Sequence, residues 1–255
     1  MLGFLKPKTD WKWAACGKHP AARDYFAFRV ETPLMMALSE WVQRGYREFA
    51  GRNKRIYGQS SWRFWSRGTS KGELLCGLLK DSSDSIGRPY PLLFMGSGVI
   101  KGWENGWAAL FHALSPIWNQ MEHIASRRFD HLKQLEIAVG NLPNPAPNER
   151  GIKPVDQSGL LEKQTARQTA LQLAENRELW VTLDGGGSME PASIAQEWAV
   201  LLGDQGVETP NALFVGGIPE RHALALYKRS LNVADFARLW SLADGEEPLV
   251  WLRAT

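Results

Sequence analysis

The chain has 255 residues, of which 44% are hydrophobic and 22% are charged, and its formal net charge is +3. This composition is typical of a packed globular protein and excludes a disordered chain, a collagen and a coiled coil. The small net charge does not predict a nucleic-acid partner, and two cysteines, Cys16 and Cys76, are too few for a disulfide framework.

The first half of the chain predicts four strands and one long helix. Residues 9–17 alternate apolar and polar side chains, as a half-buried strand does. A helix is expected over residues 33–50, because Thr32 can cap it and Pro33 fits its first turn. Three apolar segments follow as an expected antiparallel meander, at residues 60–66, 73–80 and 90–96.

The second half alternates helices with strands. Apolar residues at helical spacing predict a helix from Trp103 to Ile124 with a kink at Pro116. Further helices are expected over residues 160–176, from Pro191, and from Asn232, whose side chain can cap the last one. Strands are expected at residues 178–183 and 211–216, and Gly185–Gly187 is expected to form a turn between the first of these and the helix that joins them. This strand–helix–strand order predicts a parallel crossover.

The predicted fold class is therefore α+β: a mixed, largely antiparallel central sheet with helices on both faces, an α/β/α sandwich. Prolines are dense at residues 140–158, which are expected to be a linker or an insertion. The expected division is an N-terminal domain at 1–139 and a C-terminal part at 159–255 that packs on the same core.

Charge is distributed unevenly along the chain. Residues 1–80 hold 15 Lys and Arg against 6 Asp and Glu, whereas residues 141–255 hold 10 against 15. If the fold keeps the two regions apart, one face suits an acidic partner; if it interleaves them, the charges partly cancel.

No leader or membrane-spanning segment is expected. The N-terminal residues lack the apolar core of a signal peptide, and the longest uncharged run, 105–121, is interrupted by polar residues, Gly106 and Pro116. We expect a cytoplasmic protein without direct membrane insertion, recruited to the inner membrane only through a partner.

Motifs for cofactors, metals and catalysis are missing. There is no Gly-x-Ser-x-Gly elbow and no phosphate-binding loop, and Lys101 stands where a dinucleotide fingerprint beginning at Gly96 needs its third glycine. Cys16 and His19 have ligand-like spacing, but no second pair matches them. We expect no cofactor, no metal and no enzymatic activity.

Two clusters of polar residues, at 17–26 and 82–91, are flanked in the sequence by apolar segments. Aspartate and arginine in such turns can satisfy buried backbone groups and pair with each other, which would be a structural role. The exposed part of the clusters can instead serve recognition. Catalysis is a third alternative, in which Asp24 or Asp84 acts with His19 in a small-molecule hydrolase or transferase.

The same clusters carry a resemblance to the TagF (ImpM) family of type VI secretion accessory proteins. Residues 17–26 resemble its opening motif G-K-L-P-x-x-x-D-F, and residues 77–92 resemble its signature G-x-L-x-x-S-x-D-x-x-G-R-x-x-P-L. The aromatic segment at residues 62–64 matches a W-R-F strand of the family, and residues 178–181 and 213–219 resemble two later segments.

The resemblance implies a non-catalytic regulator that represses type VI secretion after translation by binding a forkhead-associated scaffold protein. A structural subunit of the secretion apparatus is a further alternative. Partner contacts are expected in the two clusters and at nearby aromatic residues; the candidates are Lys18, Arg23, Asp24, Trp62, Asp84, Arg88 and Tyr90.

Overall fold

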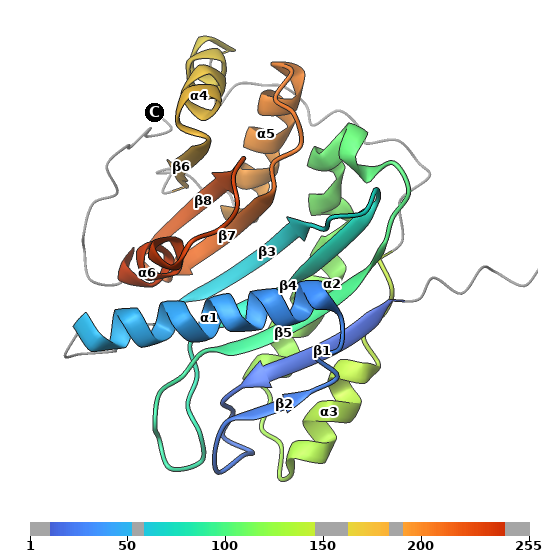
Figure 1. Ribbon diagram of the computed structural model, residues 1–255, viewed down its shortest axis with the longest axis vertical. Helices are drawn as coiled ribbons and strands as arrows, with labels where there is room; N and C mark the ends of the chain where they lie inside the picture. The colour runs from blue at the N-terminus through green and yellow to red at the C-terminus, as the bar shows by residue number, and fades with distance from the viewer. Residues whose placement is uncertain (1–10, 53–58, 146–162, 184–190, 243–255) are drawn as a thin grey trace, which may run out of the picture.

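The protein is described by a computed structural model that covers residues 11–52, 59–145, 163–183 and 191–242 (Figure 1). In these residues the strands form one eight-stranded sheet in the order β2-β1-β5-β4-β3-β7-β8-β6. The strands are β1 (Lys12–Gly17), β2 (Phe26–Phe28), β3 (Ser61–Arg67), β4 (Glu73–Lys80), β5 (Leu92–Val99), β6 (Glu178–Thr182), β7 (Ala212–Ile218) and β8 (Arg221–Tyr227).

Helices cover both faces of the sheet, which confirms the α+β prediction (Figure 1). One face carries α1 (Pro33–Arg52) and α6 (Val233–Ser241), which pack on each other. The other face carries the 3₁₀ helix η1 (Trp103–Ala109), α2 (Leu110–Ser126), α3 (Leu132–Gly140), α4 (Lys163–Asn176) and α5 (Pro191–Asp204).

Strand alternation divides the core into these two layers. In β3, Trp62 and Phe64 belong to the layer under α1, whereas Trp65 belongs to the layer under η1 and α2. All three rings are at most 1% exposed. Because neighbouring side chains of a strand point to opposite faces, the sequence of β3 supplies apolar side chains to both core layers.

The caps follow the sequence expectations. The Met35 N–H donates to Thr32 Oγ1 at 3.2 Å at the start of α1. Asn232 and Asp235 form a reciprocal capping box at the start of α6. The expected interruption at Pro116 is displaced, because α2 continues through this proline and the non-helical backbone lies earlier, at Gly106.

The predicted parallel crossover is only half right. The strands β6 and β7 point the same way, but β8 lies between them and pairs antiparallel with both. The sequence analysis expected no strand at residues 221–227. There β8 follows β7 after a two-residue connection at Pro219 and Glu220 and pairs with it as a hairpin. Every neighbouring strand pair in the described residues is antiparallel.

The two halves of the chain share this sheet, because β7 pairs with β3. The proposed division at residues 140–158 stays a prediction, since residues 146–162 lie outside the described part. The expected turn at Gly185–Gly187 also lies outside it. No helix in the described ranges is long and apolar enough to cross a membrane.

Candidate functional site

Two loops meet at one end of the sheet (Figure 1). The first, residues 18–25, leaves β1 after Gly17, and the second, residues 81–91, joins β4 to β5. Gly17 has φ +118°, and a Cβ atom there would lie 2.0 Å from the carbonyl oxygen of Pro91. Only glycine permits so close an approach, so the first residue of the family-like motif is needed to bring the loops together.

The Asp84 carboxylate is the centre that joins the two loops. Its side chain is buried, and Oδ1 accepts the N–H groups of Ile86 at 3.1 Å and Arg88 at 2.9 Å. Oδ2 lies 2.7 Å from Arg88 Nε and 3.0 Å from Lys18 Nζ. Burial alone would raise the pKa of Asp84, but the N–H groups and the two cations outweigh it and hold this pKa well below its usual range.

Arg88 extends the connection to the first loop. Its Nη2 donates to the Arg23 carbonyl oxygen at 2.8 Å and lies 3.3 Å from Asp24 Oδ2. The backbone adds a direct bond, in which the Ser85 N–H donates to the Ala22 carbonyl oxygen at 2.8 Å. The two loops are therefore held as one unit by a buried carboxylate and a bridging guanidinium.

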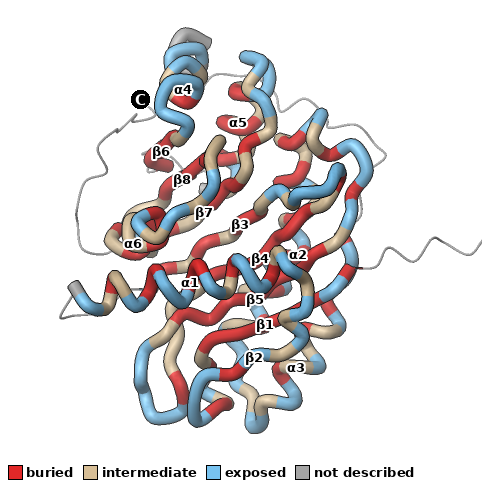
Figure 2. Tube along the Cα trace, viewed as in Figure 1, coloured by how far each residue is buried: buried red, intermediate tan, exposed pale blue. Residues whose placement is uncertain are grey.

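The outward side chains of this unit form what we call the two-loop surface, made of Arg23, Asp24, Tyr25, Ile86 and Arg88. All five are exposed, Ile86 by 70% and Tyr25 by 43%. In Figure 2 the loops that join β1 to β2 and β4 to β5 contain stretches in the pale blue of exposed residues. The sequence candidates included neither Tyr25 nor Ile86. An apolar residue inside a run of turn-forming residues was the available signal for Ile86.

The remaining candidates lie beneath this surface or away from it. Trp62 is 0% exposed and packs edge-to-face with Trp180, so its expected role as an aromatic contact is corrected to a core role. The Lys18 side chain is 12% exposed and Asp84 is buried, so both hold the loops in place. Tyr90 is half-buried, with its ring edge-to-face against Tyr25.

The catalytic alternative is not assembled in the described residues. His19 is 2% exposed, its Nδ1 accepts the Ala21 N–H at 3.0 Å, and burial lowers its pKa. None of the hydrogen bonds there joins His19 to Asp24 or to Asp84. A base and a nucleophile within hydrogen-bond reach, which such chemistry requires, are not formed from this trio.

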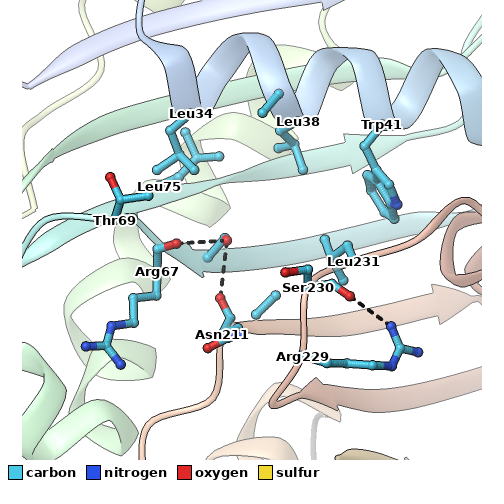
Figure 3. Close-up of a pocket in the computed structure, with 14 residues that line it drawn as sticks. Leu34, Leu38, Trp41, Arg67, Thr69, Leu75, Asn211, Arg229, Ser230 and Leu231 are labelled. Atoms are coloured by element: carbon cyan, nitrogen blue, oxygen red, sulfur yellow. Dashed lines mark hydrogen bonds between the residues drawn. The ribbon is translucent and has the colours of Figure 1, made fainter.

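A separate pocket of about 500 Å³ lies between α1 and the segment that joins β8 to α6 (Figure 3). Leu34, Leu38 and Trp41 of α1 form one apolar wall, and Leu231 stands opposite. At its polar end, Ser66 Oγ lies between the carbonyl oxygens of Arg67 and Asn211, and the Arg67 guanidinium points away from that hydroxyl. None of the predicted site residues lines this pocket.

The described part of the chain holds neither a metal-binding cluster nor an activated thiol. It contains no cluster of three or more His, Cys, Asp or Glu side chains that could hold a metal ion. Cys16 and Cys76 are free and buried, as expected, and burial raises the pKa of both thiols. Neither cysteine is therefore an activated nucleophile.

Comparison with known proteins gives two findings. The model of the TagF N-terminal domain, described as type VI secretion system-associated, matches residues 14–142. The fold is similar to the crystal structure of PA0076 from Pseudomonas aeruginosa PAO1, with a TM-score of 0.55 and 17% identity, over 94% of this chain and 97% of that one. No curated protein matches the sequence.

Proposed function

Because the chain belongs to the TagF family of type VI secretion system-associated proteins, we propose that it is a non-catalytic accessory protein that regulates this secretion after translation. In this proposal it represses secretion by binding a forkhead-associated scaffold component of the apparatus in the cytoplasm, near the inner membrane. The partner and the sign of the regulation come from the resemblance of the sequence motifs.

The observation that carries the proposal is the construction of the two-loop surface. Its exposed side chains combine arginine, tyrosine and isoleucine, residue types that contribute strongly or fit well at the centre of protein interfaces. The buried Asp84 carboxylate fixes the backbone that presents them. A partner therefore meets a preorganised surface and loses little conformational entropy in ordering it.

The test measures the affinity of the purified chain for the forkhead-associated component. The variant R23E/I86D changes two exposed side chains. In the described residues these side chains form no hydrogen bond or ion pair, since only the backbone of Arg23 and Ile86 takes part in the hydrogen bonds of the two loops. We expect binding to weaken by on the order of a hundredfold, since a desolvated apolar contact and a charge contact are both lost.

The matched control is V99D. Val99 is a 52% exposed apolar residue at the far end of β5, whose first residue, Leu92, adjoins the two loops. This variant should bind the component as the wild type does. Equal loss in R23E/I86D and V99D, or no loss in either, would contradict a role for the two-loop surface.

A cellular measurement tests the regulatory part of the proposal. Deleting the gene should raise type VI secretion, and the wild-type chain and V99D should restore repression whereas R23E/I86D should not. Restoration of repression by R23E/I86D would exclude the two-loop surface from the regulation. Loss of secretion on deletion of the gene, or copurification of the chain in fixed stoichiometry with assembled apparatus, would favour a structural subunit instead.

A further inference from the structure

The turn after α2 lies against the two loops. We call the exposed side chains of this turn, together with the two-loop surface, the widened surface. Phe129 in this turn packs against His19 of the first loop, with ring centroids 5.8 Å apart. One residue before the turn, Ser126 Oγ accepts a hydrogen bond at 3.2 Å from Lys80 Nζ, at the point where the second loop begins. Three segments that are distant in sequence thus meet at one end of the sheet.

The cations of this widened surface are left without carboxylate partners. Arg23, Arg127 and Arg128 are exposed, and in the described residues none of them contacts an Asp or Glu side chain. The Arg127 guanidinium lies over the Phe129 ring at 5.1 Å from its centroid, which fixes its direction without neutralising its charge.

The nearby carboxylates do not balance these charges. Asp84 is occupied by Lys18 and Arg88, and Asp24 lies 3.3 Å from Arg88. Asp130, next to Phe129, is exposed and offsets one cation. A positive surplus remains around the apolar groups of the two-loop surface.

We infer that the partner presents an acidic segment to this surface, with carboxylates that meet Arg23, Arg127 and Arg128 and an apolar side chain that meets Tyr25 and Ile86. This inference rests on the proposed function and names the chemistry of its partner. Guanidinium groups suit it because they pair with carboxylates in a bidentate geometry and are weakly hydrated.

An acidic partner element makes binding depend on salt. Exposed charges are screened over about 10 Å at 0.1 M salt, so affinity for the forkhead-associated component should fall steadily between about 0.05 and 0.5 M. The variant R127E/R128E should bind on the order of tenfold more weakly at low salt and lose most of this salt dependence.

The single variant R128E guards against loss of the Arg127–Phe129 contact, because no contact of Arg128 with an aromatic ring is found in the described part of the chain. R128E should also weaken binding and reduce its salt dependence, but by a smaller factor than R127E/R128E. The conservative R127K/R128K keeps the charge and should retain most of the salt dependence. R167E, on exposed Arg167 of α4, is the control and should leave binding unchanged.

A synthetic probe separates the sources of negative charge. We expect a short fluorescent peptide of glutamate and leucine to bind, and the same peptide with glutamine in place of glutamate not to bind. Equal binding of both peptides, or tighter binding of a DNA oligonucleotide than of the acidic peptide, would overturn the inference.

The outcome also separates this inference from the proposed function. If R23E/I86D loses the partner whereas R127E/R128E binds it at every salt concentration as the wild type does, only the acidic-partner inference fails. If the component does not bind the wild type, or binds R23E/I86D unchanged, the proposed function fails.

Discussion

Two ionic clusters in this molecule use the same side-chain chemistry in opposite ways. In the two loops a buried carboxylate, Asp84, is surrounded by Lys18 and the half-exposed Arg88. At the other cluster a guanidinium, that of Arg229, is surrounded by the carboxylates of Asp235 and Glu178. The first organises exposed loops, and the second joins α6 to the sheet.

The second cluster is closed on itself. Arg229 donates to Asp235 at 2.6 and 2.7 Å, and Arg238 donates to Glu178 at 3.0 Å while its guanidinium lies 4.4 Å from the centroid of the Trp180 ring. Each of its charged side chains is at most 27% exposed. In the closed cluster the charges satisfy one another, so the fold loses stability when one partner is removed, whereas the outward arginines of the first cluster are available for a partner.

The largest expected effect comes from opening the closed cluster with D235A. This change removes one of the two carboxylate partners of Arg229 and leaves Glu178 as the other. It also removes the half of the capping box in which Asp235 Oδ2 accepts the Asn232 N–H. Removing one partner of a fully buried ion pair costs about 3–5 kcal/mol. Because the Arg229 side chain is 24% exposed and keeps Glu178, we expect the lower end of this range, which corresponds to a Tm lower by roughly 6–12 °C. Thermal unfolding measures it, and binding of the partner to the folded fraction should not change.

D235N is the matched control, because its amide oxygen can still accept the Asn232 N–H that caps α6. Its loss should be clearly smaller than that of D235A. A Tm for D235A close to that of the wild type would show that the closed cluster does not stabilise the fold.

The second-largest effect is expected for D84N, and it should appear in partner affinity more than in Tm. The asparagine oxygen keeps an acceptor for the N–H groups of Ile86 and Arg88, but the charge that holds Lys18 is lost. The loops should lose their fixed geometry, so we expect partner affinity to fall by on the order of tenfold and amide exchange in residues 81–91 to speed up. The fall in Tm should be smaller than for D235A.

If D84N lowers Tm more than D235A while its folded fraction binds normally, the distinction between the two clusters is wrong. The test is independent of R23E/I86D, because Asp84 is 2% exposed and lies beneath the surface that those substitutions change.

The pH dependence of stability distinguishes two carboxylates of the second loop, because the fold raises the pKa of Asp81 and lowers that of Asp84. Asp81 Oδ1 is buried without a hydrogen-bond partner, and desolvation raises the pKa of this carboxyl to about 6, only partly opposed by the Ser82 N–H. The folded protein therefore binds the proton more tightly at Asp81 than the unfolded chain, whose pKa is about 3.9. The contribution of this group to the free energy of unfolding is therefore largest below about pH 4 and is lost as the pH rises through about 6.

D81N should remove that loss, raising Tm by a few degrees at pH 8 and changing it little at pH 3.5. Asp84 behaves in the opposite way: its lowered pKa means that its stabilisation is present above pH 4 and is lost as the pH falls further. A Tm difference between D81N and the wild type that does not depend on pH would contradict this account of Asp81.

The fold was largely predictable because its signals are local. The helix at 33–50 and the strand at 73–80 were predicted to within two residues, since capping residues and apolar periodicity depend only on neighbours in sequence. The strand β8 itself was not expected, and neither was its position between β6 and β7, because strand order depends on contacts between segments distant in sequence.

The candidate site was predictable only in part, for the same physical reason. The sequence located both loops, but it could not tell that Asp84 points inward and Arg23 outward, because this depends on how the loops face each other. Trp62 was assigned to the surface because aromatic residues are common at interfaces, and its place under α1 became visible only with the sheet assembled. Burial of a polar residue is a property of the fold, not of its neighbours in the chain.

The smallest expected effect is that of R44A, on the exposed pair of Glu40 and Arg44 one turn apart on α1. Their side chains are 58% and 62% exposed, so both groups keep their hydration in either state and the pair is worth no more than about 0.5 kcal/mol. Tm should stay within about 1–2 °C of the wild type and partner affinity should not change. A fall as large as that of D84N would mean that the number of ionic contacts, rather than the burial of one of the charged groups, decides what such contacts contribute here.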